Sequence, residues 1–401
     1  MKFLPLLFLY IVIVFVISTD NFVGDESRYI MFADNLTHGH YSPKDDVYLW
    51  NGPGYPIILA PFILLKLPWL TAKLLNAVFL FLAVLYFYKT LQIYIKDVRR
   101  STLFSYLLGV YPTFFVYIPQ ILTEILSVFL ICGFIFHFCK LYYGSKDAMK
   151  HLCFASLYLA YLALTKIFFG YVIFLGSLIF LSLYLWKKKD TFKKAFTIYL
   201  LAFLLCSPYL LYTYSLTNRI LYWGDSGGLS LYWMSTPYEN EFGDWYDFQK
   251  VQENSRFEKH QEFFNKLKVL PNIQRDDELK KQAVKNIMQY PAKYLKNVSA
   301  NVGRMLFNYP YSYRPQKMST YFYIIPNMFL VVCSIMCIYP YFARGKIIPV
   351  EIHILIVFFF FSFVGSALLS AYPRQLMVLL PVLLIWLFLV ITHAVRIELR
   401  H

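Results

Sequence analysis

Long apolar segments separated by short polar ones make up most of the chain. A run of about 18 or more apolar residues is long enough to cross a bilayer as a helix. The predicted helices, about ten in number, lie at 3–19, 71–88, 102–118, 121–139, 151–165, 167–186, 195–214, 320–342, 347–369 and 375–393. The predicted fold class is therefore an all-α polytopic membrane protein.

Two apolar segments need separate interpretation. The first follows Lys2 and resembles a signal peptide, but it has no small-x-small cleavage site near its end. We therefore predict an uncleaved helix there. The second, 56–70, carries three prolines and is shorter than a typical membrane span. It either crosses the membrane or lies at its surface as a juxtamembrane or re-entrant segment.

The distribution of basic residues decides between these two possibilities. Loops rich in Lys and Arg stay on the cytoplasmic side of a membrane. If 56–70 crossed the membrane, the basic cluster at 187–194 would move to the outside, so we predict that 56–70 lies at the interface. The basic residues then assigned to the cytoplasm are Lys2, Lys89, Lys96, Arg99, Arg100, Lys140, Lys146, Lys150, Lys187, Lys188, Lys189, Lys193, Lys194, Arg344, Lys346, Arg396 and Arg400.

This orientation predicts three parts. An N-terminal transmembrane module, 1–214, includes a first outer loop at 20–70. A second outer-face region follows at 215–319, and the C-terminal transmembrane helices occupy 320–401. Both termini are then cytoplasmic.

Composition narrows the possible functions. Hydrophobic residues make up 59% and charged residues 15% of the chain, which excludes an ordinary soluble enzyme. The net charge of +15 is explained by membrane orientation, so no nucleic-acid partner is predicted. All six cysteines lie in apolar segments without a CxxC pattern, which argues against a disulfide framework or zinc site. His38 and His40 lack a third ligand, and we predict neither a metal nor a cofactor.

Glu124 is an unusual acid because it lies between two apolar segments. An acid at the start of a membrane helix is costly unless it is paired or hydrated. It is either part of a functional site or a helix-start acid favoured by the helix dipole, with Thr123 beside it.

The first outer loop begins with Gly24, Asp25 and Glu26, and apolar residues then recur at helical spacing. This pattern predicts a short amphipathic helix at the interface with the two acids at its start. The loop ends in the sequence NGPGYP at 51–56, which predicts a rigid turn. Taken alone, these features also fit simple helix capping followed by a loop turn.

The order of these motifs resembles the first outer loop of GT-C glycosyltransferases. More narrowly, GDExxYxxxAxxL, then Gly39-His40-Tyr41, then NGPGYP is similar to the dolichyl-phosphate-mannose protein mannosyltransferase and aminoarabinose transferase group. Asn51 departs from the aminoarabinose transferases, which have an acid at that position. Further similar motifs follow in the same order: Leu122-Thr123-Glu124, Leu164-Thr165-Lys166, Gly227-Gly228-Leu229-Ser230-Leu231-Tyr232 and Tyr372-Pro373-Arg374-Gln375.

The resemblance implies an inverting glycosyltransferase that moves a sugar from a polyprenyl-phosphate carrier to an acceptor hydroxyl or amine. Asp25 would be the general base, and Glu26 or Glu124 would orient the acceptor or the sugar. Arg374 would hold the lipid phosphate. Lys166 is either a second phosphate ligand or an interfacial lysine that reaches toward water. The predicted catalytic residues are Asp25, Glu26 and Glu124, and the predicted substrate-binding residues are Arg374, Lys166, Tyr29, Asn51 and Tyr55.

The implied partners are a polyprenyl-phosphate-linked sugar donor, membrane lipid, and a glycan, lipid or protein acceptor. We predict a multi-pass protein with its active site on the outer or lumenal face, and a bacterial inner membrane is favoured over the endoplasmic reticulum. Aromatic residues between 222 and 246 either stack on sugars, form an interfacial belt or form a small core. A flippase or transporter for lipid-linked sugars, a non-catalytic scaffold, and an oligosaccharide polymerase or ligase of cell-surface glycan assembly remain as alternatives.

Overall fold

The structure, a computed structural model, describes residues 2–22, 24–43, 45–144, 146–316, 318–344 and 347–394. Within these ranges every regular element is a helix, which confirms the predicted all-α class. Lys346, Arg396 and Arg400, which contribute to the predicted cytoplasmic charge, lie outside the described residues.

Seven of the described helices are long and apolar enough to cross a membrane, judged by length and composition. They are α4 (Trp69–Tyr94), α7 (Thr123–Tyr142), α8 (Ala148–Thr165), α9 (Phe168–Lys187), α17 (Tyr321–Ala343), α18 (Val350–Leu369) and α19 (Pro373–His393). An eighth span results if α10 (Asp190–Leu205) and α11 (Ser207–Thr217), which meet at a bend of 47°, are counted together. The chain is an integral, multi-pass membrane protein.

The predicted number of ten spans is not confirmed. The first candidate is α1 (Leu4–Ile17), whose 14 residues would extend only about 21 Å at 1.5 Å per residue, less than the hydrocarbon thickness of a bilayer. The candidate at 102–118 is divided into α5 (Val98–Gly109) and α6 (Pro112–Tyr117). The break has a local cause, because the residue before a proline is pushed toward extended backbone and Tyr111 is extended.

The ambiguous segment 56–70 is mostly α3 (Gly54–Leu64). Its 11 residues are too few to cross a bilayer as a helix. It packs against α2 (Asp25–Thr37) and α8. This short length is compatible with the predicted interfacial position.

Helix α7 lies at the centre of the apolar bundle and packs against α4, α8 and α19. It is apolar on nearly all sides, as expected for a helix surrounded by others, and most of its residues are buried. Helix α19 is buried to the same extent. The first turns of these two helices carry Glu124 and Arg374, so two of the predicted site residues are anchored in the core of the bundle.

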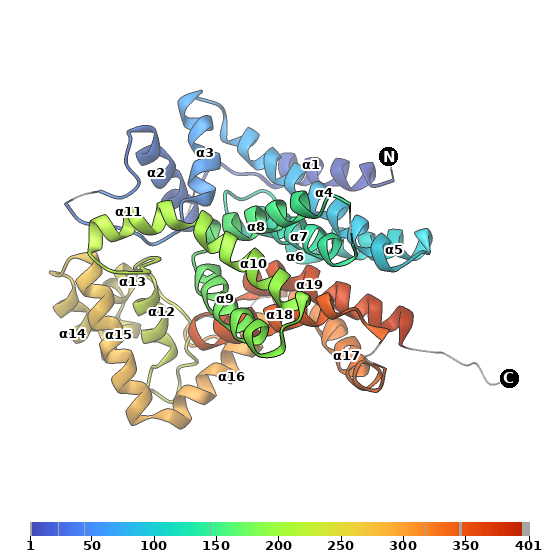
Figure 1. The fold of residues 1–401 in the computed structure, drawn as a ribbon. Coiled ribbons are helices and arrows are strands. Elements are labelled where there is room, and N and C mark those ends of the chain that lie inside the picture. Colours follow the sequence, from blue (N-terminus) through green and yellow to red (C-terminus); the bar gives the residue numbers. More distant parts are fainter. Residues whose placement is uncertain are drawn as a thin grey trace.

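The region 215–319, which the loop charges predict to be the second outer-face region, forms a helical layer with a hydrophobic core of its own. Its helices are α12 (Gly227–Met234), α13 (Phe248–Glu253), α14 (Glu258–Leu267), α15 (Asn272–Gln289) and α16 (Pro291–Phe307), with short 3-10 turns η1 (Ser255–Phe257) and η2 (Met318–Thr320). Tyr232, Trp233 and Tyr246 belong to this second core, so these aromatic residues form the small core rather than an open surface. Helices α12 to α15 gather at one end of the molecule, whereas α5 and the start of α1 lie at the other (Figure 1).

Candidate active site

Asp25 lies at the start of α2 and is held by two guanidinium groups. The preceding Gly24 has a φ of +63°, a conformation that glycine adopts without strain. Asp25 Oδ2 lies 2.6 Å from Arg374 Nη1, and Asp25 Oδ1 pairs with Arg28 one helical turn away. Burial by itself would raise the pKa of Asp25, but the two guanidinium groups outweigh it and lower the pKa to about 2.

Glu124 extends this pairing into a larger cluster. Its Oε1 accepts a hydrogen bond from Lys166 Nζ at 2.8 Å and lies 3.9 Å from Arg374 Nε. The Glu124 side chain is only 1% exposed, so these two cations are what offsets its buried charge. Together with the Asp25 pairs, this forms a charged cluster of three cations and two carboxylates, namely Arg28, Asp25, Arg374, Glu124 and Lys166.

Arg374 is positioned by the turn between α18 and α19. Helix α19 begins at Pro373, a residue that favours the first helical position, and Arg374 is next. The Tyr372 backbone N–H donates to Gln375 Oε1 at 2.9 Å, which closes the helix start. Asn301 of α16 accepts a hydrogen bond from the Ala371 N–H at 3.0 Å. The second outer-face region therefore helps to fix the turn that carries Arg374.

The NGPGYP turn packs directly on the end of α8. A Cβ atom at Gly52 would lie 2.1 Å from the Leu164 carbonyl oxygen, and one at Gly54 would lie 2.5 Å from Thr165 Oγ1. Only glycine permits such an approach at these two positions. The turn is thereby held beside Lys166, which ends α8.

Tyr29, Asn51 and Tyr55 form a polar and aromatic layer next to the charged cluster. Asn51 Nδ2 donates to the Tyr29 hydroxyl at 3.0 Å, and the rings of Tyr29 and Tyr55 are in edge contact at 5.4 Å. Burial raises the pKa of the Tyr29 phenol, and the nearby carboxylates of Asp25 and Glu124 raise it further. The side chains at these three positions, which the family resemblance predicts to bind substrate, therefore lie close to Asp25 and Glu124.

Glu26 is placed differently. Its side chain is buried, and its Oε1 accepts a hydrogen bond from the Ile121 backbone N–H at 2.8 Å instead of joining the ion pairs of the cluster. This bond holds the loop that leads into α7 and hence into Glu124. The geometry favours a positioning role for Glu26, and substrate contact by its carboxylate stays a prediction.

The sequence interpretation missed Arg28 as a member of the site. Its spacing of three residues from Asp25 on a predicted helix was the available signal, because such residues face each other. The histidines His38 and His40 lie apart from the cluster, and His38 is exposed and bonds to the Asp34 carbonyl. Over the described ranges, no group of three or more His, Cys, Asp or Glu residues is arranged to hold a metal ion.

The chain thus combines an apolar helical bundle, a charged cluster at the ends of its helices and a separate helical layer. Among solved structures, the chain is similar to the archaeal oligosaccharyltransferase AglB from Archaeoglobus fulgidus, which is in complex with an inhibitory peptide and a dolichol-phosphate. The match covers 97% of this chain and 50% of that chain, with 13% identity and a TM-score of 0.52. This likeness confirms the predicted GT-C fold, and the chain spans half the length of AglB.

A second similar structure is ArnT from Cupriavidus metallidurans, bound to undecaprenyl phosphate. That match has 12% identity and a TM-score of 0.44 and covers 96% of this chain and 76% of that chain. Comparison with protein-family models and with curated protein sequences gives no match.

Proposed function

We propose that the protein is an inverting glycosyltransferase that moves a sugar from a polyprenyl-phosphate carrier to an acceptor hydroxyl or amine on the outer face of the membrane. The observation that supports this proposal most is the charged cluster. Its three cations exceed its two carboxylates, which suits a phosphate anion. It also contains a carboxylate able to accept a proton.

The donor phosphate would bind to Arg374, with Lys166 as a second ligand. A guanidinium presents two parallel N–H donors to a phosphate, whereas an ammonium acts as a point charge. The leaving group carries growing negative charge as its bond to the sugar breaks, and fixed cations stabilise that charge. The isoprenoid tail would remain in the bilayer beside the apolar helices.

Asp25 would act as the general base. With both guanidinium groups in place, the pKa of Asp25 is about 2, which makes the carboxylate a weak proton acceptor. A donor phosphate that takes over Arg374 removes one of these partners, so the pKa of Asp25 rises and its basicity increases. Donor binding would thus prepare the base, and Arg28 would keep it oriented.

The transfer step then needs a single displacement. The acceptor oxygen or nitrogen bonds to the anomeric carbon while the bond from that carbon to the phosphate oxygen breaks. The lipid phosphate leaves with the bonding electrons, and the acceptor proton passes to Asp25. One base suffices for inversion, in contrast to the nucleophile and acid of a retaining mechanism.

The test is an assay of the purified protein with a panel of undecaprenyl-phosphate and dolichyl-phosphate sugars. We expect release of free polyprenyl phosphate with at least one donor, and we expect Asp25→Asn to lower turnover by about 10²–10⁴-fold because general-base catalysis is lost. Asp34→Asn on the exposed side of the same helix is the matched control and should retain activity.

Two results would contradict the proposal. Normal turnover in Asp25→Asn would remove Asp25 as the base. No release from any donor, together with movement of the intact lipid-linked sugar between leaflets, would favour a flippase instead.

A further inference from the structure

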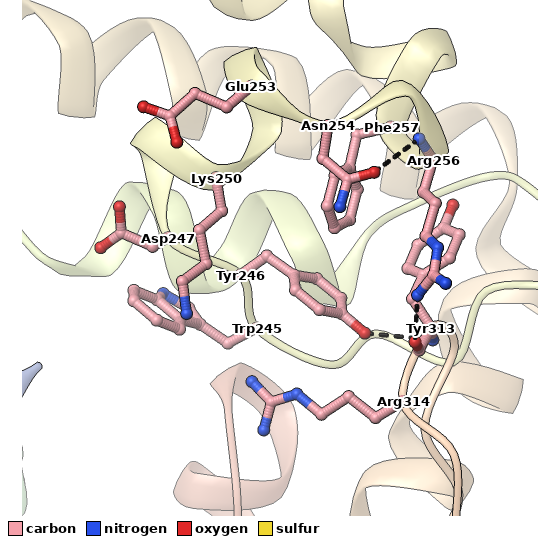
Figure 2. Close-up of a pocket in the computed structure, with 10 residues that line it drawn as sticks. All are labelled: Trp245, Tyr246, Asp247, Lys250, Glu253, Asn254, Arg256, Phe257, Tyr313 and Arg314. Atoms are coloured by element: carbon pink, nitrogen blue, oxygen red, sulfur yellow. Dashed lines mark hydrogen bonds between the residues drawn. The ribbon is translucent and has the colours of Figure 1, made fainter. Parts of the chain in front are cut away.

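A second concave site lies in the outer-face region beside Trp245 (Figure 2). It is a cavity of about 370 Å³, within the size range of small-molecule sites. Aromatic side chains form much of its wall, among them Trp245, Tyr246, Phe257 and Tyr313. None of the residues that line it belongs to a candidate membrane span, so a ligand would enter from water and not from the bilayer.

The charged residues around this cavity leave an excess of positive charge. Lys250, Arg256 and Arg314 face two acids, Asp247 and Glu253. Asp247 also has a structural role, because its Oδ1 accepts the Gln249 backbone N–H at 2.9 Å and so caps α13. The cavity therefore favours an anion.

Arg314 and Lys250 are the cations best placed to bind such an anion. The Arg314 guanidinium lies 5.5 Å from the ring centres of both Tyr246 and Tyr311, an arrangement that holds the group without using its N–H donors in ion pairs. Neither Arg314 nor Lys250 forms an ion pair with any residue in the described part of the chain. Figure 2 shows both side chains extending to the part of the cavity where Trp245 lies.

Trp245 lines the cavity and is connected to the charged cluster through its contact with Trp50. Its ring lies 6.3 Å from that of Trp50, and the Arg28 guanidinium lies 5.2 Å from the Trp50 ring. On the other side, the Trp245 backbone N–H donates to the Tyr372 hydroxyl at 2.9 Å, two residues before Arg374. Trp50 and Tyr372 therefore lie between the cavity and the charged cluster, so a molecule in the cavity that extends past Trp245 would approach the cluster.

We propose that this cavity binds the acceptor substrate and that the acceptor is an anionic saccharide. One face of a sugar ring would pack on Trp245, since a large aromatic ring offers a flat apolar surface. A carboxylate or phosphate on that sugar would pair with Arg314 and Lys250, with the arginine fork giving two parallel hydrogen bonds. This inference rests on the proposed function, because a hydroxyl of the acceptor that extends from the cavity past Trp245 to the charged cluster is the group that Asp25 would deprotonate.

Direct binding to the purified full-length protein tests the inference without any donor. The probes are methyl β-glucuronide, glucose 6-phosphate, neutral methyl β-glucoside and inorganic phosphate, measured by calorimetry. We expect one or both anionic sugars to bind at least about tenfold more tightly than methyl β-glucoside, since a charged hydrogen bond contributes that much. The affinity should fall by a similar factor in Arg314→Gln and Lys250→Gln.

Lys259→Gln is the matched control, because Lys259 is an exposed lysine of the same region that lies over Tyr238 and outside the cavity. It should bind the probes like the unchanged protein. All three substituted side chains are exposed, so the variants should fold normally. Equal affinity for the charged and neutral sugars, or no binding of either, would overturn the inference. Inorganic phosphate binding as tightly as glucose 6-phosphate would show recognition of an anion alone and would overturn the saccharide assignment.

The same experiment separates this inference from the proposed function. Asp25→Asn should still bind the anionic sugar, because Asp25 does not line the cavity. If sugar binding persists and depends on Arg314 while no donor is consumed, the acceptor site stands and the transferase proposal fails. If donor turnover depends on Asp25 while Arg314→Gln changes nothing, the opposite holds.

Discussion

Each carboxylate oxygen of Asp25 forms an ion pair with a different guanidinium group. At the scale of single residues, this arrangement means that the site is held together by charge before any substrate is present. These ion pairs also place two demands on Asp25 and Arg374. Asp25 must be ionised to hold Arg374, and under the proposed function Arg374 would exchange its bond to Asp25 for bonds to the donor phosphate.

Replacing Arg374 tests its phosphate role. Arg374→Lys keeps the charge but loses the planar fork, so donor affinity and turnover should both fall by roughly tenfold or more. Arg374→Ala should lose more, because it also leaves the buried Glu124 with Lys166 alone. Binding of undecaprenyl phosphate by calorimetry measures the first effect, and Arg99→Lys at an exposed position is the control. Unchanged donor affinity in Arg374→Ala would place the phosphate elsewhere.

Arg28 has a separate, testable effect on the pH dependence of the reaction. A base must be deprotonated to act, so activity is lost as the pH falls through the pKa of Asp25. In the free enzyme that pKa is about 2, and removal of one guanidinium group raises it. The acid limb of kcat/KM should therefore move to higher pH in Arg28→Gln and move less in Arg28→Lys. An unmoved acid limb in Arg28→Gln would show that Arg28 does not tune Asp25.

At the scale of elements, the site depends on close contact between a turn and a helix end. Gly52 touches the backbone of Leu164 so closely that an added methyl group must push the NGPGYP turn away from α8. The same elements carry Asn51 and Lys166. A small displacement of the turn relative to α8 would therefore move residues of the charged cluster and the layer beside it.

Gly52→Ala should accordingly cost stability and activity together. Overpacking of this kind typically costs about 1–3 kcal/mol, and the displaced turn should also weaken donor binding. The free energy of unfolding and the donor affinity are the two measurements. Gly227→Ala is the matched control, because a Cβ there meets only the flexible end of Lys280 at 3.6 Å. A Gly52→Ala protein as stable and active as the control would show that the contact is not needed.

At the scale of the whole molecule, the orientation in the membrane remains a prediction from loop charge. Asp45 is an exposed residue of the first outer loop, and Lys189 lies in the basic loop before α10. In a Cys153→Ser background, which removes the exposed native cysteine, Asp45→Cys should react with an impermeant thiol reagent in intact cells. Lys189→Cys should react only after permeabilisation. The reverse pattern would invert the topology and place the charged cluster on the cytoplasmic side.

The local properties of the chain were readable from the sequence. Apolar length and helical spacing depend on neighbouring residues, and so the candidate spans, the amphipathic α2 and its two leading acids could be predicted. The ordered motifs also predicted that Asp25, Glu124, Lys166 and Arg374 belong to one site, and the structure brings these four side chains together. The break at Pro112 shows the limit of this reasoning, because apolar composition continues across it while the helix does not.

Only the tertiary structure decided how these residues meet. Asp25 and Arg374 are 349 positions apart, and a single sequence carries no measure of the packing that closes such a distance. The bond between Glu26 and the Ile121 N–H and the contact between Trp50 and Trp245 likewise depend on which distant segments are brought together. Charge pairing acts over a few ångströms in space, whereas sequence patterns report neighbours along the chain.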